Sequence, residues 1–235
     1  MKNENKKILA FGAHPDDVEF GATGLLIKEI EGGAEVKIVV CSLGEAGTNG
    51  TPESRKKEAQ SAAKHIGAEF EYINLGGDCH IEDNTKSRIK IAEIIRKWKP
   101  DIVLAPSLSE NQHPDHTALA QIVRASSRLA RYGGLKELKK LPTHTVDSLY
   151  YYPSSAEFDK KPDIVIDVSE QYSKWVEAME IHKSQMKTRG YLNIVSSKAK
   201  YLGSTIGVEY AVPLWVNDPI MIESITALGS SRKFK

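Results

Sequence analysis

The stretch that decides the fold is Ile8-Leu9-Ala10-Phe11-Gly12-Ala13-His14-Pro15-Asp16-Asp17. Its first four residues are all apolar, which is typical of a central strand of a parallel sheet that is buried on both faces. Gly12 ends the apolar run, and a histidine and two adjacent carboxylates follow at once. Such side chains are poor core residues, so we expect a metal site where this strand ends.

A second group of the same kind follows another apolar run. Ile102-Val103-Leu104-Ala105 reads as a strand, and Asn111-Gln112-His113-Pro114-Asp115-His116 comes shortly after it. We expect the two loops to meet over one metal ion, with the rest of the chain as the frame that brings them together.

Strands alternate with helices along the chain, which indicates a parallel sheet with helices on both faces. A helix should start at Asp16 or Asp17 and run to Gly32-Gly33; Pro52 should open the next helix and Gly67 end it. Asn84 or Thr85 should cap a third helix, another should follow His116, and Ser169 should cap a long one. The expected strands are 8–11, 36–41, 70–75, 102–105, 148–152 and 164–168, with short edge or cap strands at 207–210 and 221–224.

The predicted fold class is a single α/β, Rossmann-like domain over residues 1–235. Its core should occupy about 6–170, followed by a C-terminal helix and cap over about 169–235. Right-handed crossovers leave few strand orders open, and one of them is 3-2-1-4 for the first four strands. Strands 1 and 4 are then neighbours, and a crevice opens at their carboxyl ends, where both polar groups lie.

Composition excludes several classes of function. The chain has 235 residues and a formal net charge of +1, so nothing favours nucleic acid or an anionic membrane surface as a partner. Cys41 and Cys79 lack metal-type spacing and read as thiols in a reducing compartment. No signal peptide or membrane-spanning run is present, so we expect a cytoplasmic protein whose partner is a small molecule.

The two groups carry the residue types of a hydrolytic metal site. Three ligands and an open position for water can come from His14, one residue of the Asp16-Asp17 pair and one of His113 and His116. The second carboxylate can take the proton of the attacking water. The second histidine can stabilise an oxyanion or protonate the leaving amine, with Asp115 holding it charged.

These residues resemble a known family. Ala13-His14-Pro15-Asp16-Asp17 and His113-Pro114-Asp115-His116 are similar to the signature motifs of the LmbE-like (PIG-L) zinc deacetylases, which remove N-acetyl groups from N-acetylglucosaminyl compounds. Further stretches resemble one subgroup of this family, which deacetylates N-acetylglucosaminyl malate in bacillithiol biosynthesis. These stretches are Gly50-Thr51-Pro52-Glu53-Ser54-Arg55, Arg131-Tyr132-Gly133-Gly134, His182-Lys183-Ser184-Gln185, and Tyr201-Leu202-Gly203 through Ile206-Gly207-Val208.

The resemblance implies a role for each site residue. The zinc ligands are His14, Asp17 and His116, with Fe²⁺, Mn²⁺ or Co²⁺ as other possible ions. The catalytic residues are Asp16 as general base, His113 as oxyanion stabiliser or proton donor, and Asp115, which orients His113. The substrate is an amidosugar, which Arg55 contacts. Tyr191 also binds the substrate: it sits over the site from a mobile loop and helps to hold the oxyanion. The resemblance also suggests a homo-oligomer.

Simpler explanations and other functions stay open at this point. Each aspartate can be a helix cap, and Arg55 can be a surface arginine in a first helical turn. A histidine-x-aspartate pair with a distant histidine also fits a non-haem iron oxygenase. A nucleotide- or sugar-binding module without catalysis is a third hypothesis, although no Gly-x-Gly-x-x-Gly turn follows the first strand. A deacetylase with another substrate is a fourth.

Overall fold

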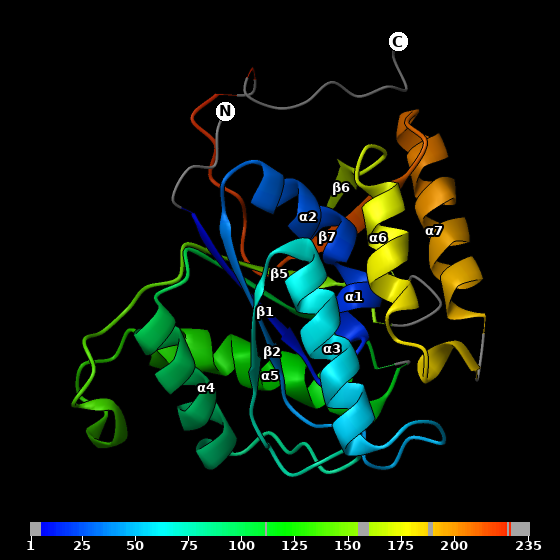
Figure 1. Ribbon diagram of the computed structural model, residues 1–235. Coiled ribbons are helices and arrows are strands. Elements are labelled where there is room, and N and C mark those ends of the chain that lie inside the picture. Colours follow the sequence, from blue (N-terminus) through cyan, green and yellow to red (C-terminus); the bar gives the residue numbers. More distant parts are fainter. Residues whose placement is uncertain (1–5, 111, 155–159, 188–189, 225, 227–235) are drawn as a thin grey trace.

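The computed structural model describes residues 6–110, 112–154, 160–187, 190–224 and 226, so Asn111 of the second polar group lies outside the described residues. In the described part of the chain, one seven-stranded sheet has the order β3-β2-β1-β4-β5-β7-β6 (Figure 1). The strands are β1 (Lys7–Gly12), β2 (Glu35–Val40), β3 (Glu69–Tyr72), β4 (Ile102–Pro106), β5 (Ser148–Tyr152), β6 (Ile164–Asp167) and β7 (Ala211–Val216).

Helices connect most of these strands. They are α1 (Asp17–Gly21), α2 (Thr23–Glu31), α3 (Pro52–Ile66), α4 (Thr85–Trp98), α5 (Pro114–Leu129), α6 (Tyr172–Glu180) and α7 (Tyr191–Ile206), with short 3-10 turns η1 (Lys136–Leu138) and η2 (Gln185–Lys187). No helix among the described residues has the length and apolar character needed to span a bilayer.

The first four strands have the order 3-2-1-4 that the sequence left open. Strand β1 pairs in parallel with β2 on one side and β4 on the other. Pairing of β2 with β3 and of β4 with β5 is also parallel, whereas β7 runs antiparallel between β5 and β6. The carboxyl ends of β1, β3 and β4 therefore meet along one edge, which is where the site lies.

Each face of the sheet has its own hydrophobic core. Alternate residues of β1 point to opposite faces: Ile8 and Ala10 into one core, Leu9 and Phe11 into the other. Helices α2, α3, α6 and α7 contribute to the first core, and α4 and α5 cover the second (Figure 1). This explains why the strand is apolar at every position.

Several predicted helix ends are confirmed. Pro52 opens α3 after Thr51, whose hydroxyl accepts a hydrogen bond from the Ser54 amide. Gly67 ends this helix in a left-handed conformation, with φ 91°. Asn84 caps α4 by accepting from the Ser87 amide.

Three expectations about the first half of the chain are wrong in detail. The helix expected up to Gly32-Gly33 is broken at Ala22 into α1 and α2. Asp16 stands before α1 but makes no side-chain capping hydrogen bond there. Helix α5 begins at Pro114, so His116 lies in its first turn and does not precede it.

The C-terminal region differs more. Ser169 does not cap α6, which begins at Tyr172, because its hydroxyl bonds to Asp167 and the Tyr210 carbonyl. Strand β7 replaces the two short strands expected at 207–210 and 221–224; Pro213 lies within it, and a proline argues against an interior strand in a sequence. Helix α7 was not anticipated at all.

Candidate metal centre and active site

The loop that follows β1 is closed by its own hydrogen bonds. The His14 amide donates to Asp17 Oδ2 at 2.9 Å, which holds the aspartate beside the histidine. Asp16, between them, has φ 125°, a region that favours glycine. Backbone strain at a non-glycine residue costs on the order of 1–3 kcal/mol and concentrates at functional sites.

Three side chains from the two polar groups converge where β1 and α5 meet. His116 Nε2 lies 3.0 Å from Asp17 Oδ1 and 3.2 Å from His14 Nδ1. His14 Nδ1 lies 3.6 Å from Asp17 Oδ2. All three residues are buried. Because ligands about 2.0–2.2 Å from a tetrahedral zinc ion lie roughly 3.3–3.6 Å apart, this arrangement fits such an ion.

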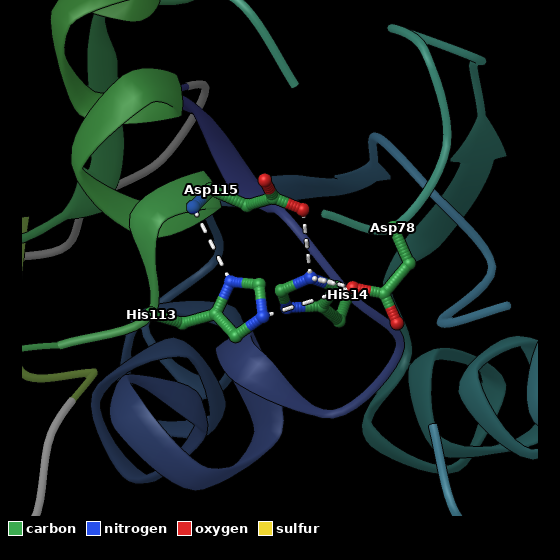
Figure 2. Close-up of side chains that lie close together, drawn as sticks. All are labelled: His14, Asp78, His113 and Asp115. Atoms are coloured by element: carbon green, nitrogen blue, oxygen red, sulfur yellow. Dashed lines mark hydrogen bonds and ion pairs between the residues drawn. The ribbon is translucent and has the colours of Figure 1, made fainter. Parts of the chain in front are cut away.

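A second group lies on the other side of His14 (Figure 2). His14 Nε2 is 3.0 Å from Asp78 Oδ1 and 3.2 Å from Asp115 Oδ2. His14, Asp78, His113 and Asp115 also lie close enough together to hold a metal ion, so the two candidate groups share His14. A neutral imidazole has a free lone pair on one nitrogen and a proton on the other, so His14 can serve a cation in only one of these groups.

Asp78 is a site residue that the motifs in the sequence did not predict. It follows Gly76 and Gly77, whose φ angles of 130° and 98° turn the chain back over the sheet edge after β3. The Asp78 carboxylate also accepts from the Ala46 amide and is buried. Two glycines and an acid at the carboxyl end of a strand were the signal available in the sequence.

Asp115 contacts His113 differently from the expectation. Its carboxylate accepts from the amides of Cys79 and Ile81 and faces His14, so it orients that histidine. Its backbone amide donates to His113 Nδ1 at 3.2 Å (Figure 2). His113 therefore caps α5, and its protonated nitrogen in the neutral state is Nε2.

The ionisable side chains around His14, Asp17 and His116 shift one another's pKa values. Burial alone would lower the pKa of His14, but hydrogen bonds to Asp115 and Asp17 raise it to about 12. Burial works against the Asp17 carboxylate too, yet the adjacent His116 holds its pKa well below the usual range. Burial and the charges of His14 and His116 lower the pKa of His113. The region thus favours bound positive charge beside Asp17 and a neutral His113.

Asp16 and Arg55 lie together at the edge of this group. Arg55 Nη2 is 3.5 Å from Asp16 Oδ2 and donates to the Pro15 carbonyl at 3.1 Å, while Nη1 donates to the Gly44 carbonyl at 3.0 Å. Burial and the neighbouring charge of Asp17 raise the pKa of Asp16 to about 7. A carboxylate poised near neutral pH is suited to accept a proton.

These residues line one cavity of about 520 Å³, in the range of small-molecule sites. The expected metal, catalytic and substrate residues His14, Asp16, Asp17, Arg55, His113, His116 and Tyr191 all contribute to its wall. Tyr191 is the first residue of α7, not a loop residue, and its ring stacks on Phe20 with centroids 5.4 Å apart. Asp115 is buried behind His14.

Comparison with known proteins gives the family. Residues 9–127 match the family model described as "PIG-L: GlcNAc-PI de-N-acetylase". Diacetylchitobiose deacetylase of Thermococcus kodakarensis is 26% identical over 89% of this chain and 82% of its own length. A probable N-acetyl-alpha-D-glucosaminyl L-malate deacetylase 2 of Bacillus cereus is 25% identical over 83% and 90%. The 4-oxalmesaconate hydratase of Pseudomonas putida is 23% identical over 79% and 76%.

Among solved structures, the conserved protein TT1542 from Thermus thermophilus superposes with a TM-score of 0.84 at 29% identity, covering 95% of this chain and 99% of that one. The fold, the two histidine–aspartate motifs and the matched family model all indicate the same family. The chain belongs to the PIG-L family of N-deacetylases, hydrolases that act on N-acetyl amide bonds.

Proposed function

We propose that this protein is a zinc-dependent deacetylase that converts N-acetylglucosaminyl malate to acetate and the free amine, a step of bacillithiol biosynthesis. The observation that carries the proposal is the convergence of His14, Asp17 and His116 across about a hundred residues of sequence. The similarity to the Bacillus cereus relative supports the choice of substrate.

The metal belongs, in this proposal, to the group formed by His14, Asp17 and His116. Two imidazole nitrogens and one carboxylate oxygen are a set of ligands that zinc commonly takes in hydrolytic sites. His14 Nε2 then carries its proton toward Asp78 and Asp115, which is the usual carboxylate–histidine arrangement around a metal. Zinc bound there supplies a water of low pKa and polarises the amide carbonyl.

Asp16 is the general base of the reaction. Its carboxylate lies beside the metal ligands, and Arg55 holds it in place at 3.5 Å. With its pKa raised to about 7 by burial and by Asp17, Asp16 can take the proton of the attacking water at neutral pH and pass it to the leaving amine.

His113 donates a hydrogen bond to the developing oxyanion. Because Nδ1 accepts from the backbone at the start of α5, Nε2 presents a proton to the cavity without any need for a charged ring. A fixed donor of this kind stabilises charge that appears only in the transition state. In this proposal Arg55 contacts the substrate from the cavity wall and also positions Asp16, while its guanidinium donates to the carbonyls of Gly44 and Pro15.

An acetate-release assay tests the function. We expect zinc-loaded protein to release acetate from N-acetylglucosaminyl malate faster than from N-acetylglucosamine or diacetylchitobiose, and a chelator to abolish the reaction. Preference for diacetylchitobiose would favour the specificity named for the Thermococcus relative. Acetate release from none of these substrates, with hydration of an unsaturated dicarboxylate instead, would reject the proposal in favour of the hydratase chemistry named for the Pseudomonas relative.

A further inference from the structure

Helix α7 presents one continuous stripe to the cavity. The residues that line it are spaced three, four, seven, eight and eleven positions from the first, which is one face of a helix. They are Tyr191, Ile194, Val195, Lys198, Ala199 and Leu202. Trp175 of α6 and Val212 and Pro213 of β7 complete an apolar wall of the same cavity. The cavity thus has an apolar part beneath α7 beside its polar end at the metal ligands.

Lys198 interrupts this stripe. An inward-facing position between Val195 and Leu202 calls for an apolar residue, and a departure from such a pattern marks functional sites. The Lys198 side chain is partly buried, and burial lowers its pKa to about 8. Lys200, two positions on, is exposed and lies off the stripe.

The polar end of the cavity is unsuited to a second anionic group. Asp16 and Asp78 line it beside the proposed metal ligands, and in the proposed function the acetamide takes the open position at the metal. Arg55, the cation at that end, donates to the carbonyls of Pro15 and Gly44. A substrate with a neutral acetamide at one end and an anionic group at the other is therefore favoured in one orientation, with the anion toward α7.

We propose that Lys198 recognises an anionic group, a carboxylate or a phosphate, at the end of the substrate remote from the acetamide, while the α7 wall contacts the hydrocarbon part of that group. The inference rests on the proposed function for the amidosugar part of the ligand. It adds a residue that determines specificity and that lies outside both histidine–aspartate motifs.

Three variants and three substrates test it. Lys198→Met removes the ammonium and keeps the length of the side chain, Lys198→Arg keeps the charge, and Lys200→Met is the matched control on the exposed face. The substrates are N-acetylglucosaminyl malate, N-acetylglucosamine 1-phosphate and the neutral methyl N-acetylglucosaminide. We expect Lys198→Met to raise KM for an anionic substrate by roughly 10- to 100-fold, as for loss of a charge-assisted hydrogen bond.

Selective loss is the decisive result. The same variant should keep kcat, and its activity on the methyl glycoside should stay within about twofold, while Lys198→Arg restores most of the affinity. If only N-acetylglucosamine 1-phosphate binds more weakly in Lys198→Met, Lys198 is part of an anion site, but malate is not the group that it recognises. Equal losses on all three substrates, no loss on either anion, or the same loss in Lys200→Met would overturn the inference.

A binding measurement separates this inference from the proposed function. If wild-type protein releases no acetate, the proposed deacetylation fails, and calorimetry with the two anionic glycosides then decides the role of Lys198. Binding that weakens at least tenfold in Lys198→Met and not in Lys200→Met supports an anion site. Binding that is absent, or unchanged in Lys198→Met, refutes it.

Discussion

The two ends of the cavity are built in different ways. The polar end comes from loops at the carboxyl ends of β1, β3 and β4, and its side chains hold one another: His14 alone contacts Asp17, Asp78, Asp115 and His116. The other wall includes one face of α7, a helix that packs against the first sheet core, together with Trp175 and Pro213. The difference separates the side chains proposed to bind the metal, which the sheet edge positions, from the helix face where we propose that the substrate is selected.

Loss of a metal ligand should have the largest effect. His116→Ala removes one of three convergent donors, so we expect zinc binding to disappear and acetate release to fall by roughly a thousandfold or more. Metal analysis and single-substrate kinetics measure both. His65→Ala, which removes a histidine paired with Glu177 away from the site, is the control. Retention of stoichiometric zinc in His116→Ala would instead favour the alternative group with Asp78 and His113.

Loss of Asp16, the proposed general base, should have the next largest effect. In Asp16→Asn the metal ligands are intact, so kcat should fall by roughly 10²- to 10⁴-fold while zinc content stays at the wild-type level. Asp83→Asn, at an exposed aspartate paired with Arg88, should leave kcat within about twofold. A fully active Asp16→Asn enzyme would mean that another group accepts the proton.

Loss of the Asp78 charge should have a smaller effect than loss of His116 or of Asp16. Asp78→Asn keeps the shape of the side chain and removes its charge, so His14 loses part of what orients it. We expect zinc affinity or kcat/KM to fall by roughly 10- to 100-fold, the usual effect of changing a residue behind a metal ligand. Competition with a chelator of known affinity measures the zinc affinity. An unchanged zinc affinity would show that Asp115 alone orients the His14 ring.

The smallest effect concerns stability of the metal-free protein, where the adjacent aspartates should behave oppositely. The pKa of Asp16 is raised to about 7, so its ionised form destabilises the fold increasingly as pH rises from about 4 through 7. The pKa of Asp17 is lowered, so its ionised form stabilises the fold above about pH 4, and this contribution is lost as pH falls through the folded value.

Chemical denaturation in the presence of a chelator checks this contrast. At pH 8, Asp16→Asn should raise the free energy of unfolding by about 1–3 kcal/mol, and Asp17→Asn should lower it by a similar amount. The gain in Asp16→Asn should shrink at pH 5.5, where Asp16 is already protonated in the folded protein. If both variants lower the free energy of unfolding, contacts other than charge dominate at both positions.

Much of the fold was readable from the sequence because its signals are local. The apolar run before Gly12 and the breakers Pro52, Gly67 and Asn84 act within a few residues, and the structure places strands and helix ends where they indicate. Strand β7 and helix α7 were missed for the opposite reason. Pro213 argues against strand β7 in the sequence, and Lys198 interrupts the apolar face of helix α7. Each residue is accommodated only by its tertiary neighbours.

The sequence by itself determined that two histidine–aspartate motifs follow two strands, and that these strands can be neighbours in a parallel sheet. Tertiary structure alone decided which atoms meet. It assigned the Asp115 carboxylate to His14 and its amide to His113, brought Asp78 from a third loop, and set Lys198 in the wall of the same cavity. Spacing along a chain fixes the edge at which a loop emerges, but the direction of each side chain depends on contacts between segments far apart in sequence.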